Sequence, residues 1–293
     1  MTPLFISQAT DYVERIDDDV TPADLKPLVL DATGLSVRRI DRFIQLALIG
    51  AARSVRDAKP DRDTAVYLGS GRGDLEVIIG VMQSLLRDGQ PPKPLSFINT
   101  VSNASCYYVA QSLNLTGRSS FVCNRYFAFE SILELASLDV ASGEVGSALI
   151  GTVDVVVPPL SGHRLRLDLD PSTPVADASH WLLVRRDDEG ALCQLLAVES
   201  FIDRAAFEQW LIKQPERENW VVATGQFMSA SEARDWATSM HAEVFDYRSD
   251  RPYYDSHSGA VINAYASSDE RRPLLHVNRD PSGRYSAMMV SRN

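Results

Sequence analysis

Cysteine is scarce in this sequence, long apolar runs are missing, and no tract of positive charge stands out. The three cysteines, Cys106, Cys123 and Cys193, are widely spaced and lie at no metal-ligand interval from a histidine. Neither a disulfide framework nor a zinc site is therefore indicated. No stretch approaches the roughly 18 apolar residues of a membrane-spanning helix, and the first residues lack the basic segment of a signal peptide. We expect a cytoplasmic protein that does not enter the membrane and holds no metal or cofactor.

Positive charge is outnumbered by negative charge. Lys and Arg total 29 against 39 Asp and Glu, which gives a formal net charge of −10. A surface for nucleic acid or anionic lipid needs clustered positive charge, so we expect a protein or small-molecule partner instead. The composition, with 45% hydrophobic residues, is that of a soluble globular protein with a large core.

The sequence does contain an alternation of short β-rich runs and helices, which indicates a layered α/β fold with a partly parallel sheet. The β-rich runs are residues 64–68, 119–123, 147–157, 181–186, 192–200, 220–223, 274–277 and 285–290. Helices are expected from Thr21-Pro22 onward and over 40–55, 74–89, 104–113, 126–142, 204–213 and 229–240. From Val157 to Pro174 the composition shifts to Pro, Ser, Arg and Asp. We interpret that segment as the join between residues 1–165 and residues 166–293.

Two of these helices have patterned faces. Apolar residues spaced three and four apart between Ile40 and Val55 predict one buried stripe, with an opposite face formed by Arg38, Arg39, Arg42 and Arg53. The helix that Asp74 begins has a predicted core face of Leu75, Ile78, Ile79, Met82, Leu85 and Leu86. The glycines before it, Gly69, Gly71 and Gly73, have the spacing G-x-G-x-G and not that of a dinucleotide-binding turn. They predict a tight strand-to-helix turn with positive φ.

Histidine and cysteine chemistry is weakly indicated. The five histidines stand alone, and His257 is the most polar in its surroundings because it lies in the turn Ser256-His257-Ser258-Gly259. Cys106 lies on an expected helix beside Tyr107, where a cysteine is ordinarily a small core residue. Nothing basic adjoins Cys106 that would lower the pKa of its thiol.

The stretch from Ser112 to Val157 is the most informative. A strand of residues 119–123 ends in a sharp turn at Asn124-Arg125, and a helix begins near Tyr126. This is the arrangement of a nucleophile elbow, in which the reactive side chain stands at the start of the helix. Here the residue in that place is a tyrosine.

Residues on both sides of the elbow carry a family resemblance. Leu113-Asn114-Leu115-Thr116-Gly117, then Gly143-Glu144, then the run from Ala148 to Val153 resemble the pattern around the reactive cysteine of the β-ketoacyl synthase family. Tyr126 falls at the cysteine position. The resemblance implies a thiolase-like layered α/β fold made of two related halves.

The second half resembles the same family in the same order. Val221 to Gly225 is similar to the family's V-E-A-H-G, so Thr224 falls at the first catalytic histidine. Arg248 to Tyr253 is similar to K-S-x-x-G-H, which puts Arg248 at the lysine and Tyr253 at the second histidine. Asn278 to Ala287 resembles the closing segment. The second half is shortened relative to such enzymes, mostly after Gly259.

These departures imply a subunit without catalytic residues of its own. Condensation in the family needs a thiolate and two histidines, and a phenol with an ordinary pKa near 10 is a poor substitute for a thiol. The chain is most similar to the chain-length factors of type II polyketide synthases, which form heterodimers with an active ketosynthase. The resemblance implies an interface along the strand before the elbow, formed by Ser119, Ser120, Phe121, Val122 and Cys123. It also implies that Tyr126, Phe127 and Phe129 line or plug the partner's acyl tunnel.

Acyl carrier protein is expected to dock mainly on the partner subunit, since carrier proteins are acidic and this chain is also negative. Arg38, Arg39 and Arg42 form the local exception. The product is expected to be a polyketide, a polyene of the aryl polyene kind or a fatty-acid-like chain.

Two other functions stay open at this stage. One is an enzyme with replaced acyl-thioester chemistry, in which His257 or Cys106 acts. The other is a homodimeric scaffold or acyl-binding protein on the thiolase fold, because a fold alone does not fix a function. Co-expression with an active ketosynthase separates them, since only the chain-length-factor hypothesis predicts a one-to-one complex.

Overall fold

The computed structural model describes residues 4–18, 22–216, 219–249 and 251–292. Its strands are β1 (Leu4–Ile16), β2 (Ala65–Ser70), β3 (Ser119–Cys123), β4 (Ser147–Asp154), β5 (Val175–Arg185), β6 (Cys193–Phe201), β7 (Val221–Thr224), β8 (Glu243–Val244), β9 (Leu274–Arg279) and β10 (Tyr285–Arg292). Its helices are α1 (Lys26–Thr33), α2 (Arg42–Ser54), α3 (Leu75–Leu86), α4 (Pro94–Asn99), α5 (Ala104–Ser112), α6 (Ala128–Ser142), α7 (Leu160–Leu167), α8 (Arg204–Ile212), α9 (Ala230–Ser239) and α10 (Gly259–Ser267).

One sheet of ten strands runs through the described residues, in the order β3-β2-β4-β5-β1-β6-β10-β9-β7-β8. Read outward from the β1–β6 pair, the first five strands and the last five follow the same order. The sense of each pairing also repeats: β2 is parallel to β3 and β4, as β7 is to β8 and β9, and the remaining pairs are antiparallel. The two related halves that the resemblance implies are therefore present.

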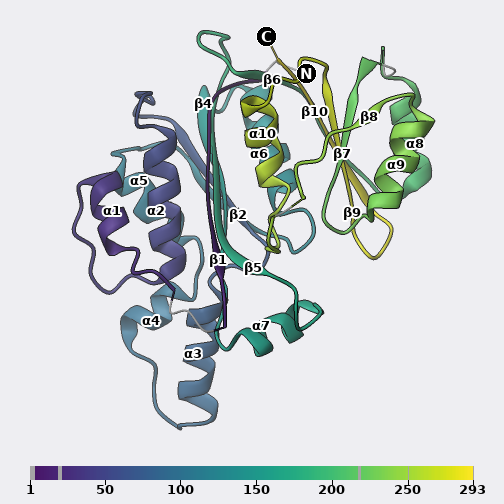
Figure 1. The fold of residues 1–293 in the computed structure, drawn as a ribbon. Coiled ribbons are helices and arrows are strands. Elements are labelled where there is room, and N and C mark those ends of the chain that lie inside the picture. Colours follow the sequence, from purple (N-terminus) through teal and green to yellow (C-terminus); the bar gives the residue numbers. More distant parts are fainter. Residues whose placement is uncertain (1–3, 19–21, 217–218, 250, 293) are drawn as a thin grey trace.

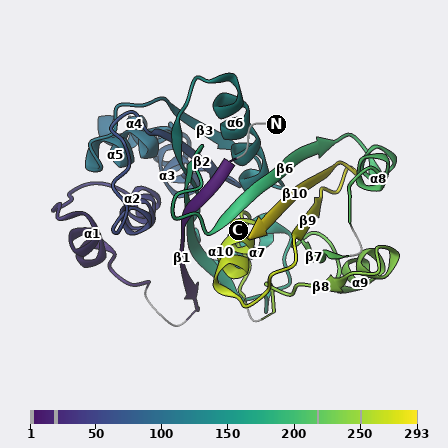
Figure 2. The ribbon, with the colours of Figure 1, turned by 90° about the horizontal axis from the view of Figure 1, so that it is seen from above.

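Helices form three layers around the two half-sheets (Figure 1). The outer face of the first half is covered by α1, α2 and α5, and that of the second half by α8 and α9, while α6 and α10 lie between the half-sheets. Figure 2 shows the strands from β6 to β8 beside α8 and α9. A separate buried apolar cluster fills each interface. The result is the thiolase-like layered fold.

The periodic elements are confirmed, with shifted ends. The strand expected at residues 119–123 has those bounds, and the helices around 40–55, 204–213 and 229–240 are α2, α8 and α9. The first helix begins at Lys26 and not at Pro22, and Thr21 lies outside the described residues. Five elements were not expected: β1, α4, α7, β8 and α10. β1 has polar residues on a half-buried surface and a register shift after Ile6, and α10 has only nine residues and follows a polar turn that contains Gly259.

Two helix faces differ from their patterns. In α2 every residue from Phe43 to Ala52 is buried, so the expected single stripe is too narrow. In α3 the expected core face is wrong, because Val81 is the one buried residue of this helix. Met82, Leu85 and Leu86 are exposed by 48%, 44% and 77%. The reason is position: α3 and α4 extend past the end of the sheet, where no other element covers them (Figure 1).

The join between the halves is a structured segment. The expected boundary between residues 165 and 166 falls inside α7, and β5 stands among the strands of the first half, between β4 and β1. Strand order favours a division after β5, in the loop of residues 186–192.

The starts of α2 and α3 share a buried carboxyl pair. Asp41 Oδ1 accepts a hydrogen bond from the Ile44 N–H at 2.9 Å and caps α2, and Asp74 caps α3 through the Val77 N–H. Burial, and then the charge of Asp41, raise the pKa of Asp74 well above its usual range. A carboxyl whose pKa is raised in the folded state stabilises the protein fully only below its unfolded pKa, and that contribution is lost as the pH rises.

We predict that the free energy of unfolding falls more steeply with rising pH in the parent than in Asp74→Asn. The asparagine keeps the capping oxygen but cannot ionise. Above pH 4 the difference should grow by up to about 1.4 kcal/mol per pH unit. Urea unfolding at pH 5, 7 and 9 measures it. Asp31→Asn, at an exposed carboxylate, is the control and should follow the parent; equal slopes in Asp74→Asn and the parent would contradict the shift.

Candidate functional site

The turn between β3 and α6 is a strand–turn–helix, as the sequence predicts. β3 ends at Cys123 and α6 begins at Ala128. Asn124 Oδ1 accepts hydrogen bonds from the backbone N–H groups of Tyr126 and Phe127, both at 3.3 Å. Asn124 therefore satisfies donors at the start of the helix, and Tyr126 stands just before the first turn of α6.

The Tyr126 side chain is held by neighbouring side chains. Its ring meets the ring of Phe227 edge-on, with centroids 4.9 Å apart. The Arg125 guanidinium lies 5.2 Å from the centroid of the Tyr126 ring, within the range of a cation–π contact. The position that carries the reactive thiol in the resembled enzymes is thus occupied by a packed aromatic ring.

Asn278, at the end of β9, joins the elbow to the middle layer. Its Nδ2 donates to the backbone carbonyl of Tyr126 at 2.9 Å and to Glu130 Oε1 at 2.8 Å. A longer contact of 3.3 Å reaches Ser258 Oγ before α10. Asn278 and Glu130 are both buried, and burial raises the pKa of the Glu130 carboxyl. The hydrogen bond from the Asn278 amide thus replaces one that the buried Glu130 carboxyl can no longer make with water.

Gly225 makes room for this amide. A Cβ atom at residue 225 would lie 2.1 Å from Asn278 Oδ1 and 2.2 Å from its Cγ, far inside van der Waals contact. The loop after β7 can therefore approach Asn278 only because residue 225 has no side chain. The same loop carries Phe227 to Tyr126.

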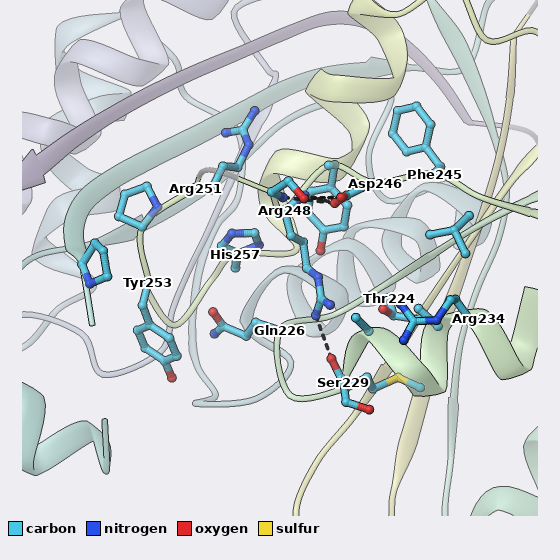
Figure 3. A pocket seen from close by; sticks show the side chains of 18 of the residues that line it. Thr224, Gln226, Ser229, Arg234, Phe245, Asp246, Arg248, Arg251, Tyr253 and His257 are labelled. Atoms are coloured by element: carbon cyan, nitrogen blue, oxygen red, sulfur yellow. Dashed lines mark hydrogen bonds between the residues drawn. The ribbon is translucent and has the colours of Figure 1, made fainter. Parts of the chain in front are cut away.

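A cavity of about 740 Å³ opens beside this loop (Figure 3). Thr224, Arg248, Tyr253 and His257 all line it. Three of the four positions that the resemblance assigns to lost catalytic groups are therefore brought together, along with the one histidine that the sequence singled out. Tyr126 does not line the cavity. Its ring contacts Phe227, whose neighbours in the sequence, Gln226 and Met228, do line it.

Arg248 and Tyr253 have structural partners. Arg248 Nη1 donates to the backbone carbonyls of Gly225, at 2.5 Å, and Met228, at 2.9 Å. It therefore holds the loop that carries Phe227. Tyr253 donates its hydroxyl to Asp255 Oδ1 at 3.1 Å, and burial followed by the charge of Asp255 raises the pKa of Tyr253. Neither side chain takes the place of a histidine that exchanges protons near neutral pH.

The buried histidines are neutral. Burial is the main cause that lowers the pKa of His257, His276 and His180 to about 3 each. The His257 ring stacks on Tyr254 with centroids 5.0 Å apart, and Tyr247 shares a hydrogen bond of 3.0 Å with His276 Nε2. These rings form a packed aromatic layer, and at neutral pH none of the three histidines carries a proton to donate as an acid.

The glycine-rich turn packs on its own chain. A Cβ atom at Gly71 would lie 2.1 Å from the Cβ of Asp255, and Gly73 has a φ of +65°. Asp154 accepts hydrogen bonds from the Gly71 N–H at 2.9 Å and the Ser256 N–H at 2.6 Å. The close contact with Asp255 leaves no space for a phosphate above Gly71, and the expectation of a structural turn is correct. Of its glycines, however, Gly73 is the one with positive φ.

Neither cysteine near the elbow has the character of a nucleophile. Cys106 is buried on α5, and burial raises the pKa of its thiol to about 12. Cys123, at the end of β3, is exposed, but its pKa is also raised, by partial burial and by Asp154 and Asp255. A reactive cysteine needs the opposite shift.

The rings expected to face a partner's tunnel are buried within this chain. Phe129 is fully buried in the cluster between the half-sheets, and Phe127 is 8% exposed. The first turn of α6 therefore points into the middle layer of this chain, and this burial argues against the expectation that the two rings line or plug a partner's acyl tunnel. The sequence also missed Phe227, Glu130 and Asp255 as parts of the site; the signal for them lay in contacts between the halves, which no local pattern carries.

Two kinds of feature are absent from the part of the chain that the structure describes. No three His, Cys, Asp or Glu side chains gather there closely enough to hold a metal ion. No helix in that part of the chain is long and apolar enough to span a bilayer.

Comparison with known proteins identifies relatives of this arrangement. The family model for the N-terminal domain of β-ketoacyl synthase matches residues 18–167, which are 150 of the 293 residues. The match includes the elbow, β4 and the predicted tunnel segment. No curated protein sequence matches the chain.

Solved structures with the same fold cover the whole chain. The ishigamide ketosynthase/chain length factor is 16% identical over 100% of this chain and 99% of its own, with a TM-score of 0.78. A type II polyketide synthase acyl-carrier protein in complex with its ketosynthase bound to the hexaketide gives 13% identity, full coverage of both chains and a TM-score of 0.68. A β-ketoacyl synthase from Burkholderia phymatum gives 10% identity, full coverage of both and a TM-score of 0.71. At such identities the likeness shows a shared fold.

We predict that Asn278→Ala lowers the free energy of unfolding by about 2–4 kcal/mol, because it leaves the Glu130 carboxyl and the Tyr126 carbonyl buried without their donor. Asn263→Ala is the matched control. Asn263 is buried on α10, but neither atom of its amide has a hydrogen-bond partner, so its loss should cost much less. Equal losses in the two variants by urea unfolding would contradict the role of Asn278.

Proposed function

Because this chain belongs to the β-ketoacyl synthase family, we propose that it is a non-catalytic subunit of the chain-length-factor type. In this role it pairs with an active β-ketoacyl synthase and shapes the acyl tunnel of that partner as a polyketide, polyene or fatty-acid-like chain grows. The observation that carries the proposal is the set of side chains at the reactive positions: Tyr126 at the elbow, with Thr224 and Tyr253 at the pocket. A ketosynthase/chain length factor among the similar structures supports it.

The chemistry of these side chains argues against condensation by this chain alone. Carrying an acyl group requires a nucleophile of low pKa, and the cavity beside the elbow is lined by no cysteine. Decarboxylation requires groups that donate or accept hydrogen bonds at a developing enolate. Thr224 and Tyr253 occupy those positions, and Tyr253 already donates to Asp255.

The edge strand β3 is the proposed pairing element. It stands at the end of the sheet order, and its one neighbour within the described residues is β2. Ser119 and Cys123 are exposed at its two ends. An open edge of five residues offers backbone donors and acceptors to a partner's strand.

An apolar surface adjoins this edge. We call it the α3–α5 surface; its exposed members are Met82, Leu85, Leu86, Leu95, Phe97, Ile98, Val101 and Tyr107. α5 packs against β3, and α3 against α4; residues 100–103 connect α4 to α5. Exposed apolar residues gathered on neighbouring elements mark interaction sites. A single partner that pairs with β3 would also cover the apolar residues of α5.

Tyr107 is the aromatic side chain we now assign to the tunnel. Unlike Phe127 and Phe129, it is 62% exposed, and it lies on the helix that packs against β3. A ring there reaches outward toward a paired subunit. The tunnel role therefore passes from α6 to α5 in this proposal.

Docking of the acyl carrier protein is proposed to fall mainly on the partner. Of the three clustered arginines, Arg42 is engaged within the fold, paired with Glu14 at 2.7 Å and also with Asp177. Arg38 and Arg39 remain exposed. Two exposed arginines on a chain of net charge −10 make a weak surface for an acidic protein.

We predict that co-expression with an active ketosynthase gives a stable one-to-one complex, and that this chain gains no acyl group from acyl carrier protein. Size-exclusion chromatography and intact mass measure the two outcomes. The ketosynthase subunit, whose thiol should acylate in the same reaction, is the positive control. A self-sufficient homodimer would favour the scaffold or acyl-binding alternative, and a stoichiometric adduct on this chain would favour replaced chemistry.

A pair of variants tests the tunnel. Tyr107→Ala should leave the melting temperature of the isolated chain nearly unchanged, because the ring is exposed there, and should lengthen the products of the complex by one or more two-carbon units. Phe129→Ala should cost about 3–5 kcal/mol through a core cavity and leave product length unchanged. Melting temperature and product distribution are measured together; unchanged products in Tyr107→Ala remove α5 from the tunnel.

A further inference from the structure

The cavity beside the elbow has positive charge without matching negative charge. It lies between the loop after β7, the first turn of α9 and residues 244–249 and 251–253. Three arginines line it, Arg234, Arg248 and Arg251, and Asp246 is the one carboxylate among its described lining residues. The charge of the cavity lining is thus opposite in sign to the net charge of −10 of the whole chain.

The carboxylates near the cavity are already engaged. Asp246 accepts hydrogen bonds from the backbone N–H groups of Arg248, at 3.0 Å, and Ser249, at 3.1 Å, and from the Ser249 hydroxyl. Arg251 pairs with Asp11 at 3.3 Å. For Arg234 and Arg248 no ion pair with a carboxylate exists within the described parts of the chain, and Arg248 is bound only to carbonyl oxygens. Figure 3 shows both guanidinium groups directed into the pocket.

The start of α9 adds to this potential. Ser229 caps the helix through a capping box with Glu232, and Ala230 and Ala233 of its first turns line the cavity. The positive end of the helix dipole thus faces the same space as the guanidinium groups. Glu232 does not neutralise them, because it pairs with Arg279 at 3.1 Å.

Unpartnered polar atoms point to an absent ligand. His257 is 4% exposed and lines the cavity, and its Nδ1 has no hydrogen-bond partner among the described residues. Gln226 Oε1 is also buried, and it too has no hydrogen-bond partner among the described residues. Buried polar atoms are rarely left without partners, so two of them on one cavity wall indicate a polar occupant.

We propose that this cavity binds a small organic oxyanion with an apolar body. Arg234 and Arg248 hold the carboxylate or phosphate group, and the apolar part lies against the side chains of Val244 and Phe245, which also line the cavity. Guanidinium groups match such oxyanions because they present paired donors. The volume of about 740 Å³ is within the range of small-ligand sites. The site goes beyond the proposed function and does not depend on a partner subunit.

The test is calorimetric titration of the full chain with three probes: hexanoate, inorganic phosphate and hexanol. Hexanoate should bind saturably, and more weakly as salt is raised. Arg234→Gln, at an exposed side chain that leaves the fold intact, should weaken it at least about threefold. Arg248→Lys keeps one charge but loses the paired donors, and should weaken it about tenfold. Arg271→Gln makes the same change of net charge at an exposed arginine outside the cavity, and should bind like the parent.

The outcomes decide both the site and the source of the oxyanion. Hexanoate binding with this pattern supports a carboxylate ligand, whereas phosphate binding with the same pattern and no hexanoate binding supports a phosphate ester. The proposal is overturned if neither anion binds, if hexanol binds as tightly as hexanoate, or if Arg271→Gln weakens binding as much as Arg234→Gln. Since the titration contains no ketosynthase, a failed complex leaves this result intact.

Discussion

The amide of Asn278 is the contact on which the centre of this molecule depends. It stands on β9 of the second half and holds the Tyr126 carbonyl and the Glu130 carboxyl of the first. The elbow is therefore positioned by the opposite half and not by β3 alone. The same amide explains why residue 225 is a glycine. The loop after β7 passes so close to Asn278 that a Cβ atom at residue 225 would collide with the amide. The aromatic ring of Tyr126 therefore stands in a tightly specified place at the start of α6.

Local pattern in the sequence was enough for most of the fold. Strands with regular apolar runs and helices with clear starts, such as α3 after Asp74, were predicted because the signals lie within a few residues. β1 and α10 were missed for a physical reason: β1 pairs on both sides while keeping polar residues, and α10 is a helix of nine residues that directly follows a polar, glycine-containing turn. The face of α3 was misassigned because periodicity reports an apolar stripe but not what covers it.

The site was predictable in outline through the motif spacing, which brought Thr224, Arg248 and Tyr253 to one cavity. What each side chain does there could not be read from spacing. Arg248 holds the backbone carbonyls of a loop about twenty residues earlier in the chain, with sequence separations of 23 and 20. The first turn of α6 faces inward through contacts with a strand 152 residues later in the chain. The same contacts give His257 a neutral ring inside an aromatic layer, where its polar sequence neighbours indicated an open turn.

The two ends of the sheet are unequal although the halves match. β3 is five residues long, whereas its counterpart β8 has only two, and Glu243 of β8 is drawn into an ion pair with Arg272. A sheet with two long open ends could add chains without limit and grow into a fibre. In the described residues β3 is the one sheet edge long enough to pair. A chain that has paired through β3 therefore has no second long edge at which the sheet could be extended. For two copies of this chain, in which β3 is the one long sheet edge among the described residues, assembly by sheet extension would therefore stop at two.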